Sequence, residues 1–324
     1  MIDINDVESA AARLAGIAVR TPLIESAELN DIAGGRVLVK PECLQRTGSF
    51  KIRGAYNLMS QMSPEQAARG VVAWSSGNHA QGVACAGKIL GIDTTIVMPE
   101  DAPRAKLERT RELGGEVVTY DRYTGDREAI ARNIAAERSA ELVPSYDHEH
   151  IIAGQGTVGL EIAEQSTELG VAPEQVLICC GGGGLTAGSA IALKARIPGV
   201  RIHTVEPEMF DDTARSLAKD RRVSVDSDAR SICDALQAHM PGEMTFEIIR
   251  RLAGPGLVVS DAEVRSAMRF AFREFKFVIE PGGAVALAAV LSGRLTTASR
   301  TTVIVISGGN VDPELFAEIQ AEPN

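Results

Sequence analysis

Short β-rich runs alternate with helical segments along most of this 324-residue chain, and this alternation limits the folds that it can adopt. Between residues 70 and 144 the runs VVAW, TTIVM, EVVTY and ELV are separated by stretches with helical spacing. A second series, after residue 149, contains VLICC, RIHTVE, LVVS and TTVIVIS. Strands that alternate with helices pair in parallel through right-handed crossovers. We therefore predict an α/β protein with two open, twisted and mainly parallel sheets.

The two series predict two domains, with the smaller one inserted into the larger. The early run VLVK, at residues 37–40, is expected to join the second sheet. Residues 1–52 and 149–324 would then form the large domain, and residues 53–148 the small one. We expect a cleft between them.

Composition and charge exclude several classes of function. The chain has 33 basic and 43 acidic residues and a formal net charge of -10, which argues against a nucleic-acid surface and against binding to an anionic membrane. No apolar run approaches the roughly 18 to 20 residues that cross a bilayer, and the polar start MIDINDVESA is unlike a signal peptide. We expect a cytoplasmic protein. Five cysteines without a CxxC pair favour reduced thiols over disulfides or zinc.

Lys51 stands where a loop is predicted to enter a helix, in the segment KPECLQRTGSFKIRGA. The first turn of a helix disfavours a nearby positive charge, and an amine must be neutral to attack an aldehyde. Lys51 is therefore a candidate for Schiff-base formation. A solvated surface lysine is the alternative.

Four consecutive glycines, Gly181, Gly182, Gly183 and Gly184, follow VLICC and precede a helix that begins near Leu185. Glycine lets backbone N–H groups converge on one point, where the start of a helix also favours negative charge. The segment is thus a candidate phosphate site, with a tight structural turn as the alternative. Its spacing matches neither the dinucleotide motif nor the nucleoside-triphosphate motif.

Polar residues also follow two other predicted strands. Ser75, Ser76, Asn78 and His79, in SSGNHAQG, come after VVAW. They can cap a helix, or bind a ligand at the carboxyl end of a parallel sheet. Ser307, in SGGN, ends a strand that is expected to be central and buried, so its hydroxyl needs a partner such as the nitrogen of a heteroaromatic ring.

The motifs SFKIRGA, SSGNHAQG, GGGGL and SGGN together carry a family resemblance. In their order and spacing, the chain resembles the fold-type II pyridoxal-phosphate enzymes of the serine/threonine dehydratase and serine racemase family, over nearly its whole length. The resemblance implies a tryptophan synthase β-like fold with pyridoxal 5'-phosphate in the interdomain cleft. It also implies an amino-acid substrate and a homodimer.

The resemblance implies a role for each motif. Lys51 would bind the cofactor covalently, and Phe50 would pack beside its ring. Asn78 would hydrogen-bond the 3-hydroxyl of the ring, and Ser307 would face the pyridine nitrogen. The backbone N–H groups of Gly181 to Leu185 would bind the phosphate. Because a neutral hydroxyl cannot keep the pyridine nitrogen protonated, the ring would be a weaker electron sink, which favours prompt loss of a β-leaving group.

Substrate contacts follow from the same resemblance. The loop from Ser75 to His79 would receive the substrate carboxylate at a helix N-terminus. Ser76 would be a second acid/base on the ring face opposite Lys51, which would make racemisation chemically possible. Arg127, in TGDREAIA, matches a substrate-contacting arginine of racemase relatives, with an exposed helix residue as the alternative.

Acidic residues follow RIHTVE, in the segment TVEPEMFDD. Oxygen-rich loops suit hard divalent cations. The resemblance implies that Glu206, Asp212 and the backbone carbonyl of Phe210 bind Mg²⁺, or alternatively Ca²⁺ or Mn²⁺. A solvated acidic loop is the other interpretation.

Two features depart from the nearest family pattern. The segment QAHMPGEM differs from the small serine- or threonine-bearing loop of plain racemases, and its His239 could contact the second carboxylate of 3-hydroxyaspartate, or be an ordinary loop residue. Because little sequence follows SGGN, we also expect the regulatory C-terminal domain of biosynthetic threonine dehydratases to be absent. We expect a catabolic role.

Together these features predict an ammonia-lyase that dehydrates serine, threonine or 3-hydroxyaspartate to a keto acid and ammonia. Lys51 would remove the α-proton as general base. One alternative is an amino-acid racemase, acting on serine with a side dehydratase activity, that uses Lys51 and Ser76 as its two bases. The other is a non-catalytic protein that binds pyridoxal phosphate.

Overall fold

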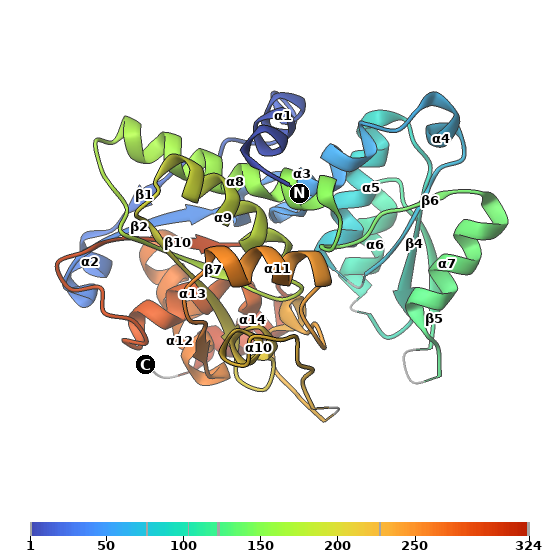
Figure 1. Ribbon diagram of the computed structural model, residues 1–324. Coiled ribbons are helices and arrows are strands. Elements are labelled where there is room, and N and C mark those ends of the chain that lie inside the picture. The colour runs from blue at the N-terminus through green and yellow to red at the C-terminus, as the bar shows by residue number, and fades with distance from the viewer. Residues whose placement is uncertain (1, 76, 103, 122–123, 227, 323–324) are drawn as a thin grey trace.

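A computed structural model describes residues 2–75, 77–102, 104–121, 124–226 and 228–322. The strands within these ranges form two separate sheets (Figure 1). One has six strands in the order β1-β2-β10-β7-β8-β9, and the other has four in the order β5-β4-β3-β6. All the described pairings between these strands are parallel except that of β1 with β2. The predicted α/β class with two mainly parallel sheets is confirmed.

The larger sheet combines the start of the chain with its second half. Its strands are β1 (Ile24–Glu25), β2 (Arg36–Pro41), β7 (Gln175–Cys179), β8 (Arg201–Pro207), β9 (Leu257–Val259) and β10 (Thr301–Ile306). Strand β2 pairs in parallel with β10, with Arg36 opposite Thr301 and Pro41 opposite Ile306. The prediction that residues 37–40 join the second sheet is therefore confirmed.

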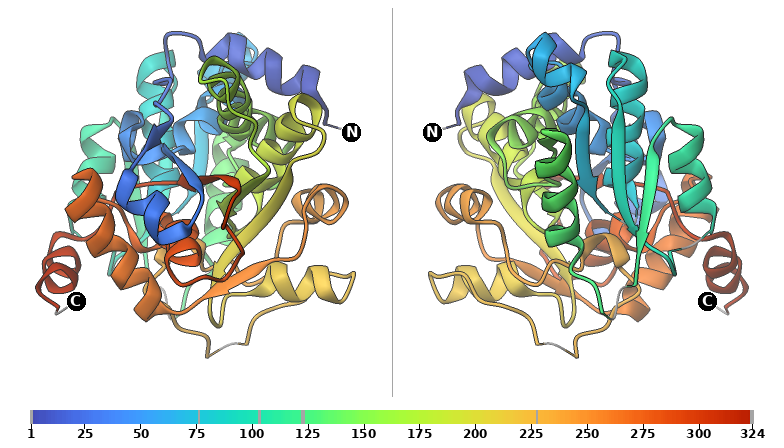
Figure 2. Two further views of the ribbon diagram at one scale, coloured as in Figure 1. Left: turned by 90° about the vertical axis from the view of Figure 1, so that its left-hand side faces the viewer. Right: turned by 90° about the vertical axis from the view of Figure 1, so that its right-hand side faces the viewer.

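Helices cover both faces of the larger sheet (Figure 1). The helices of this part of the chain are α1 (Ile4–Leu14), α2 (Ala27–Ala33), α8 (Glu149–Glu168), α9 (Gly184–Arg196), α10 (Asp212–Ala218), α11 (Glu243–Leu252), α12 (Asp261–Phe275), α13 (Pro281–Leu291) and α14 (Pro313–Ala321). Helix α13 packs along β7 to β10, while α9 packs on β7 and against α8. Helices α1 and α14 lie on opposite sides of the molecule in both views of Figure 2.

The smaller sheet carries the segments between residues 64 and 142. Its strands are β3 (Val71–Trp74), β4 (Thr94–Pro99), β5 (Glu116–Tyr120) and β6 (Glu141–Leu142), and its helices are α4 (Pro64–Ala68), α5 (Asn78–Leu90), α6 (Arg104–Glu112) and α7 (Arg127–Arg138). Alternate residues of β3 face opposite ways, since Val71 and Ala73 share a core with α5 whereas Val72 packs with α7. Burial on both faces explains why these strands are apolar throughout.

Helix α3 (Lys51–Met59) lies between the two sheets and packs against both α5 and α8. The crossing with α8 is close, because a Cβ on Gly154 would lie 2.6 Å from the carbonyl oxygen of Arg53. The predicted domain boundaries, at residues 52/53 and 148/149, fall near the start of α3 and at the start of α8. They stay a prediction.

The cysteines lie in apolar surroundings. Cys85, Cys179, Cys180 and Cys233 are buried and Cys43 is half-buried, and all five are free. Within the described ranges, no helix has both the length and the apolar character needed to cross a membrane.

Candidate active site

The loop that carries Lys51 is attached to the SGGN segment. Phe50 N donates a hydrogen bond to Ser307 O at 3.2 Å, and Gly309 N donates to Gly48 O at 2.9 Å. Short 3-10 helices, η1 (Glu42–Leu44) and η2 (Arg46–Gly48), lead into this loop. Backbone contacts therefore place the first residue of α3 beside the end of β10.

The Lys51 amine is half-buried at the start of α3. Its Nζ donates to Ser145 O at 2.9 Å and lies 5.2 Å from the centroid of the Phe50 ring. Burial lowers the pKa of Lys51 to about 8, although Glu280 acts in the opposite direction. This amine is thus more easily neutral than that of a surface lysine, which is the property that a Schiff-base lysine or a general base needs.

Asn78 joins the two sheets at the start of α5. Its Nδ2 donates to Glu280 Oε1 at 2.6 Å, and its Oδ1 accepts from Asn310 Nδ2 at 2.7 Å. Glu280 is buried at the N-terminus of α13, and burial raises its pKa to about 7. Asn78, which follows β3, is therefore linked to segments next to β10, and its contact with a cofactor stays a prediction.

The glycine loop between β7 and α9 has little room for side chains. Gly183 has a φ of 94°, which favours glycine. A Cβ on Gly182 would lie 2.3 Å from the Tyr146 ring. Thr245 Oγ1 donates to Gly182 O at 2.7 Å and so fixes the loop from the other side. The first N–H groups of a helix have no intrahelical acceptor, so this glycine cradle at the start of α9 suits a phosphate.

Ser307 lies next to the glycine loop through Cys179, the last residue of β7. A hydrogen bond links the Ser307 and Cys179 side chains, and burial raises the pKa of the Cys179 thiol to about 11. Both groups are therefore neutral near pH 7. The structure brings Lys51, Asn78, Ser307 and the loop of Gly181 to Leu185 into one region between the sheets.

Ser75 and His79 flank the start of α5. Ser75 Oγ accepts from Gly77 N at 3.2 Å. His79 is buried, with its Nε2 2.8 Å from Val143 O, and burial lowers its pKa to about 3. Because a carbonyl only accepts, Nε2 carries the proton, and His79 is neutral. The imidazole of His79 therefore adds no positive charge to this loop.

The three other predicted substrate residues are Ser76, Arg127 and His239. Ser76 lies outside the described residues. Arg127 is the exposed first residue of α7. His239 is also exposed, and its backbone carbonyl accepts from Val225 N at 2.9 Å. The roles of Arg127 and His239 stay predictions.

The predicted metal ligands lie together at the carboxyl end of β8. Glu206 is buried and accepts from Thr213 N and Ala214 N, at 2.9 and 2.7 Å. Asp212 is also buried, and neither of its carboxylate oxygens has a hydrogen-bond partner in the described structure. Burial raises the pKa of Glu206 well above its ordinary value, and Asp212 adds to this.

A cation would offset the cost of burying these two carboxylates, so the residues fit a metal. This set of acidic ligands is small. Among the described residues, there is no cluster of three or more His, Cys, Asp or Glu side chains that could hold a metal. The backbone carbonyl of Phe210 would have to complete the protein's ligands.

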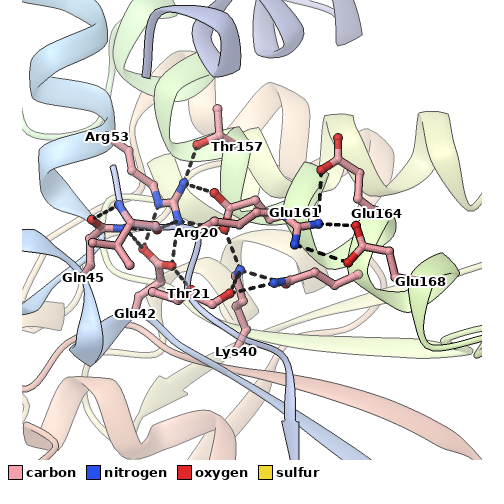
Figure 3. A network of polar contacts seen from close by, with 12 residues as sticks. Arg20, Thr21, Lys40, Glu42, Gln45, Arg53, Thr157, Glu161, Glu164 and Glu168 are labelled. Carbon is pink, nitrogen blue, oxygen red and sulfur yellow. Dashed lines mark hydrogen bonds and ion pairs between the residues drawn. The ribbon is translucent and has the colours of Figure 1, made fainter. Parts of the chain in front are cut away.

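Arg53, two residues after Lys51, is the centre of a buried ion network (Figure 3). Its guanidinium is 1% exposed and contacts Glu42 at 2.8 Å and Glu161 at 2.6 Å. Lys40 Nζ contacts the same Glu161 at 2.6 Å. Thr21 Oγ1 donates to Glu42 at 2.6 Å. Although burial favours the neutral acid, Arg53 and Lys40 hold the pKa of Glu42 below its ordinary value.

The network connects parts of the chain that are distant in sequence. Lys40 belongs to β2, Glu42 to η1, Arg53 to α3 and Glu161 to α8. These contacts fix the first turn of α3, and with it Lys51, against both the larger sheet and α8.

Sequence reasoning missed Glu280 and Tyr146. The sequence did contain a signal for a buried carboxylate at Glu280. This acidic residue follows the apolar VI of FKFVIEPGG and directly precedes Pro281, which starts a helix. Tyr146 gave no such signal, because its contact with Gly182 depends on the tertiary fold.

Comparison with known proteins identifies the family. The model of the family described as pyridoxal-phosphate dependent enzyme matches residues 15–308. The chain belongs to the fold-type II pyridoxal-phosphate enzymes. Within this group it falls in the serine/threonine dehydratase and serine racemase family.

Relatives of this fold-type II enzyme have different named activities. This chain is 44% identical to an L-threo-3-hydroxyaspartate ammonia-lyase of Pseudomonas sp, over 97% of each chain. It is 39% identical to a serine racemase of Schizosaccharomyces pombe, over 98% of this chain and 97% of the relative. The solved structure of a threonine deaminase from Solanum lycopersicum has a TM-score of 0.89 at 31% identity, covering 98% of this chain and 95% of that one. Such relatives show a lyase or racemase family and leave the reaction open.

We predict that replacing Arg53 destabilises the fold far more than replacing an exposed arginine. Arg53→Met leaves Glu42 buried without its main partner, so the free energy of unfolding should fall by about 3 kcal/mol or more. Arg20, which is 45% exposed beside Glu168, is the matched control, and Arg20→Met should cost less than about 1 kcal/mol. Urea unfolding measures both. Equal losses would contradict the importance of the network.

Proposed function

We propose that this enzyme is an ammonia-lyase that dehydrates a β-hydroxy-α-amino acid, with serine, threonine and 3-hydroxyaspartate as the candidates. The observation that carries the proposal is the half-buried Lys51 amine, with its pKa lowered to about 8, beside a neutral Ser307 site. The names of relatives such as the 44% identical Pseudomonas lyase support the same reaction class.

The residues divide the work of this reaction. Pyridoxal phosphate bound in the site would withdraw electrons from the substrate α-carbon and so acidify its proton. Lys51 Nζ would accept that proton as general base, and its lowered pKa leaves more of the amine neutral near pH 7. Loss of the α-proton and the β-hydroxyl as water gives an enamine. The enamine tautomerises, takes up water and releases ammonia, which leaves a keto acid.

The start of α5 would orient the substrate. The N–H groups of its first turn lack intrahelical acceptors and would bind the α-carboxylate. Since His79 is neutral, its side chain adds no positive charge to this attraction. The α-proton would then have to be placed within reach of Lys51.

The neutral residues at the end of β7 and β10 favour elimination. The Ser307 hydroxyl and the Cys179 thiol provide no negative charge that would hold a ring nitrogen protonated. Negative charge on the α-carbon is then stabilised less strongly, so rapid departure of the β-hydroxyl competes well with return of a proton.

A racemase is the second candidate, because the 39% identical relative of S. pombe is named a serine racemase. That reaction needs a second base opposite Lys51, for which Ser76 is the predicted residue. Chiral chromatography after incubation with L-serine separates the two functions, since accumulating D-serine supports the racemase and pyruvate alone supports the lyase.

We predict ammonia and keto-acid release in equal amounts from at least one β-hydroxy amino acid. The assay compares L-serine, L-threonine and the isomers of 3-hydroxyaspartate. Lys51→Ala should lower the rate by at least about 10²-fold, because both the cofactor bond and the general base are lost. Absence of ammonia from every substrate, or full turnover by Lys51→Ala, would refute the proposal.

We further propose that Glu206, Asp212 and the Phe210 carbonyl bind a divalent cation, with Mg²⁺ as the first candidate. The buried carboxylates and the unpartnered oxygens of Asp212 support this. The ion would be structural, because Glu206 ends β8 and Asp212 starts α10, so it would hold these two elements together.

Chelation should therefore lower the melting temperature, and added Mg²⁺ should restore it. Asp212→Asn provides the control. It removes the buried charge of one proposed ligand, so the melting temperature of the variant should respond neither to the chelator nor to Mg²⁺. Differential scanning calorimetry measures both proteins. A wild-type melting temperature that exhaustive chelation leaves unchanged would count against the site.

A further inference from the structure

Lys106, on α6 of the smaller sheet, reaches across to the part of the chain that belongs to the larger one. Its side chain is 11% exposed, and its Nζ lies 2.5 Å from Asp234 Oδ2. Asp234 begins the short 3-10 helix η3 (Asp234–Leu236), and its side chain is 51% exposed. A mostly buried lysine side chain is thus paired with an aspartate side chain that is about half exposed.

The Lys106 ammonium also lies beside the start of α5. A Cβ on Gly77 would be 3.7 Å from Lys106 Nζ. Gly77 directly precedes Asn78, in the loop that would receive the substrate α-carboxylate. Lys106 and Asp234 both act on buried Glu280, the partner of Asn78, with opposite effects on its pKa. The pair therefore borders the candidate active site.

We infer that Lys106 binds the second carboxylate of a dicarboxylic substrate such as 3-hydroxyaspartate, and that Asp234 occupies this position when the substrate is absent. The inference rests on the proposed lyase function and names its substrate class. The α5 N-terminus and Lys106 supply two neighbouring positive centres, which match two carboxylates on one small molecule. Serine and threonine have no group for the second centre.

Lys106 has a better position for this contact than His239, which the sequence suggested. His239 is exposed, and its carbonyl is bonded to Val225 N. Lys106, in contrast, already holds a carboxylate within 2.5 Å. A charged partner of low exposure also binds a carboxylate more strongly than a solvated one, because water competes less.

A simple ion pair that holds the two sheets together is the competing explanation, and it makes different predictions. If Lys106 and Asp234 only form a link, removing either side chain has the same effect on every substrate. If Lys106 binds the second carboxylate and Asp234 competes with the substrate for it, the two changes affect kcat/KM for a dicarboxylate in opposite directions. Their effect on kcat/KM for serine is then weak.

The test compares kcat/KM for L-threo-3-hydroxyaspartate and L-serine, by ammonia release, in the cofactor-loaded enzyme. Lys106→Met should lower the value for hydroxyaspartate at least about tenfold more than that for serine, and Lys106→Arg should retain part of the difference. Asp234→Asn should raise the hydroxyaspartate value, because it removes the carboxylate that competes with the substrate. Lys88→Met, at an exposed lysine of α5, should change neither.

Binding of succinate, a dicarboxylate without an amine, gives a readout that does not depend on turnover. Isothermal titration calorimetry should show weaker binding to Lys106→Met and tighter binding to Asp234→Asn than to the wild type. Equal losses on both substrates, or succinate binding that is insensitive to Lys106→Met, would overturn the inference. Absence of turnover on every substrate would instead refute the lyase proposal, and the succinate titration would still decide the role of Lys106.

Discussion

The buried guanidinium of Arg53 is the contact on which the position of Lys51 depends. It pairs with Glu42 and Glu161, which come from η1 and α8, while Lys40 of β2 shares Glu161 (Figure 3). Burying a charge is costly unless it is paired, so these groups tolerate few other arrangements. The first turn of α3 is held in one place as a result.

The same constraint explains why the candidate site lies between the two sheets. Helix α3 leaves the larger sheet and packs on α5, whose first residue is Asn78. Asn78 in turn contacts Glu280 and Asn310, near the ends of strands in the larger sheet. Movement of the smaller sheet would thus change the distance between the N-terminal end of α5 and Lys51. The Lys106–Asp234 pair spans the same boundary.

Contiguous features of the sequence predicted much of this arrangement. The strand and helix alternation predicted both sheets, and the motifs around Lys51, Asn78, Gly181 to Gly184 and Ser307 are short enough to be read locally. Contacts between distant segments were not predictable. Asn78 and Glu280 are 202 positions apart, and Arg53 and Glu161 are 108 apart. Such pairs depend on how helices cross, which local pattern does not determine.

The central claim is that Lys51 is the residue that bonds pyridoxal phosphate. Borohydride reduction of the cofactor-loaded enzyme, followed by proteolysis and mass spectrometry, tests this most directly, because reduction makes the Schiff-base linkage permanent. The phosphopyridoxyl mass should appear on the peptide that contains Lys51, with Lys40 and Lys106 unmodified. A label on another lysine, or none on Lys51, would contradict the account.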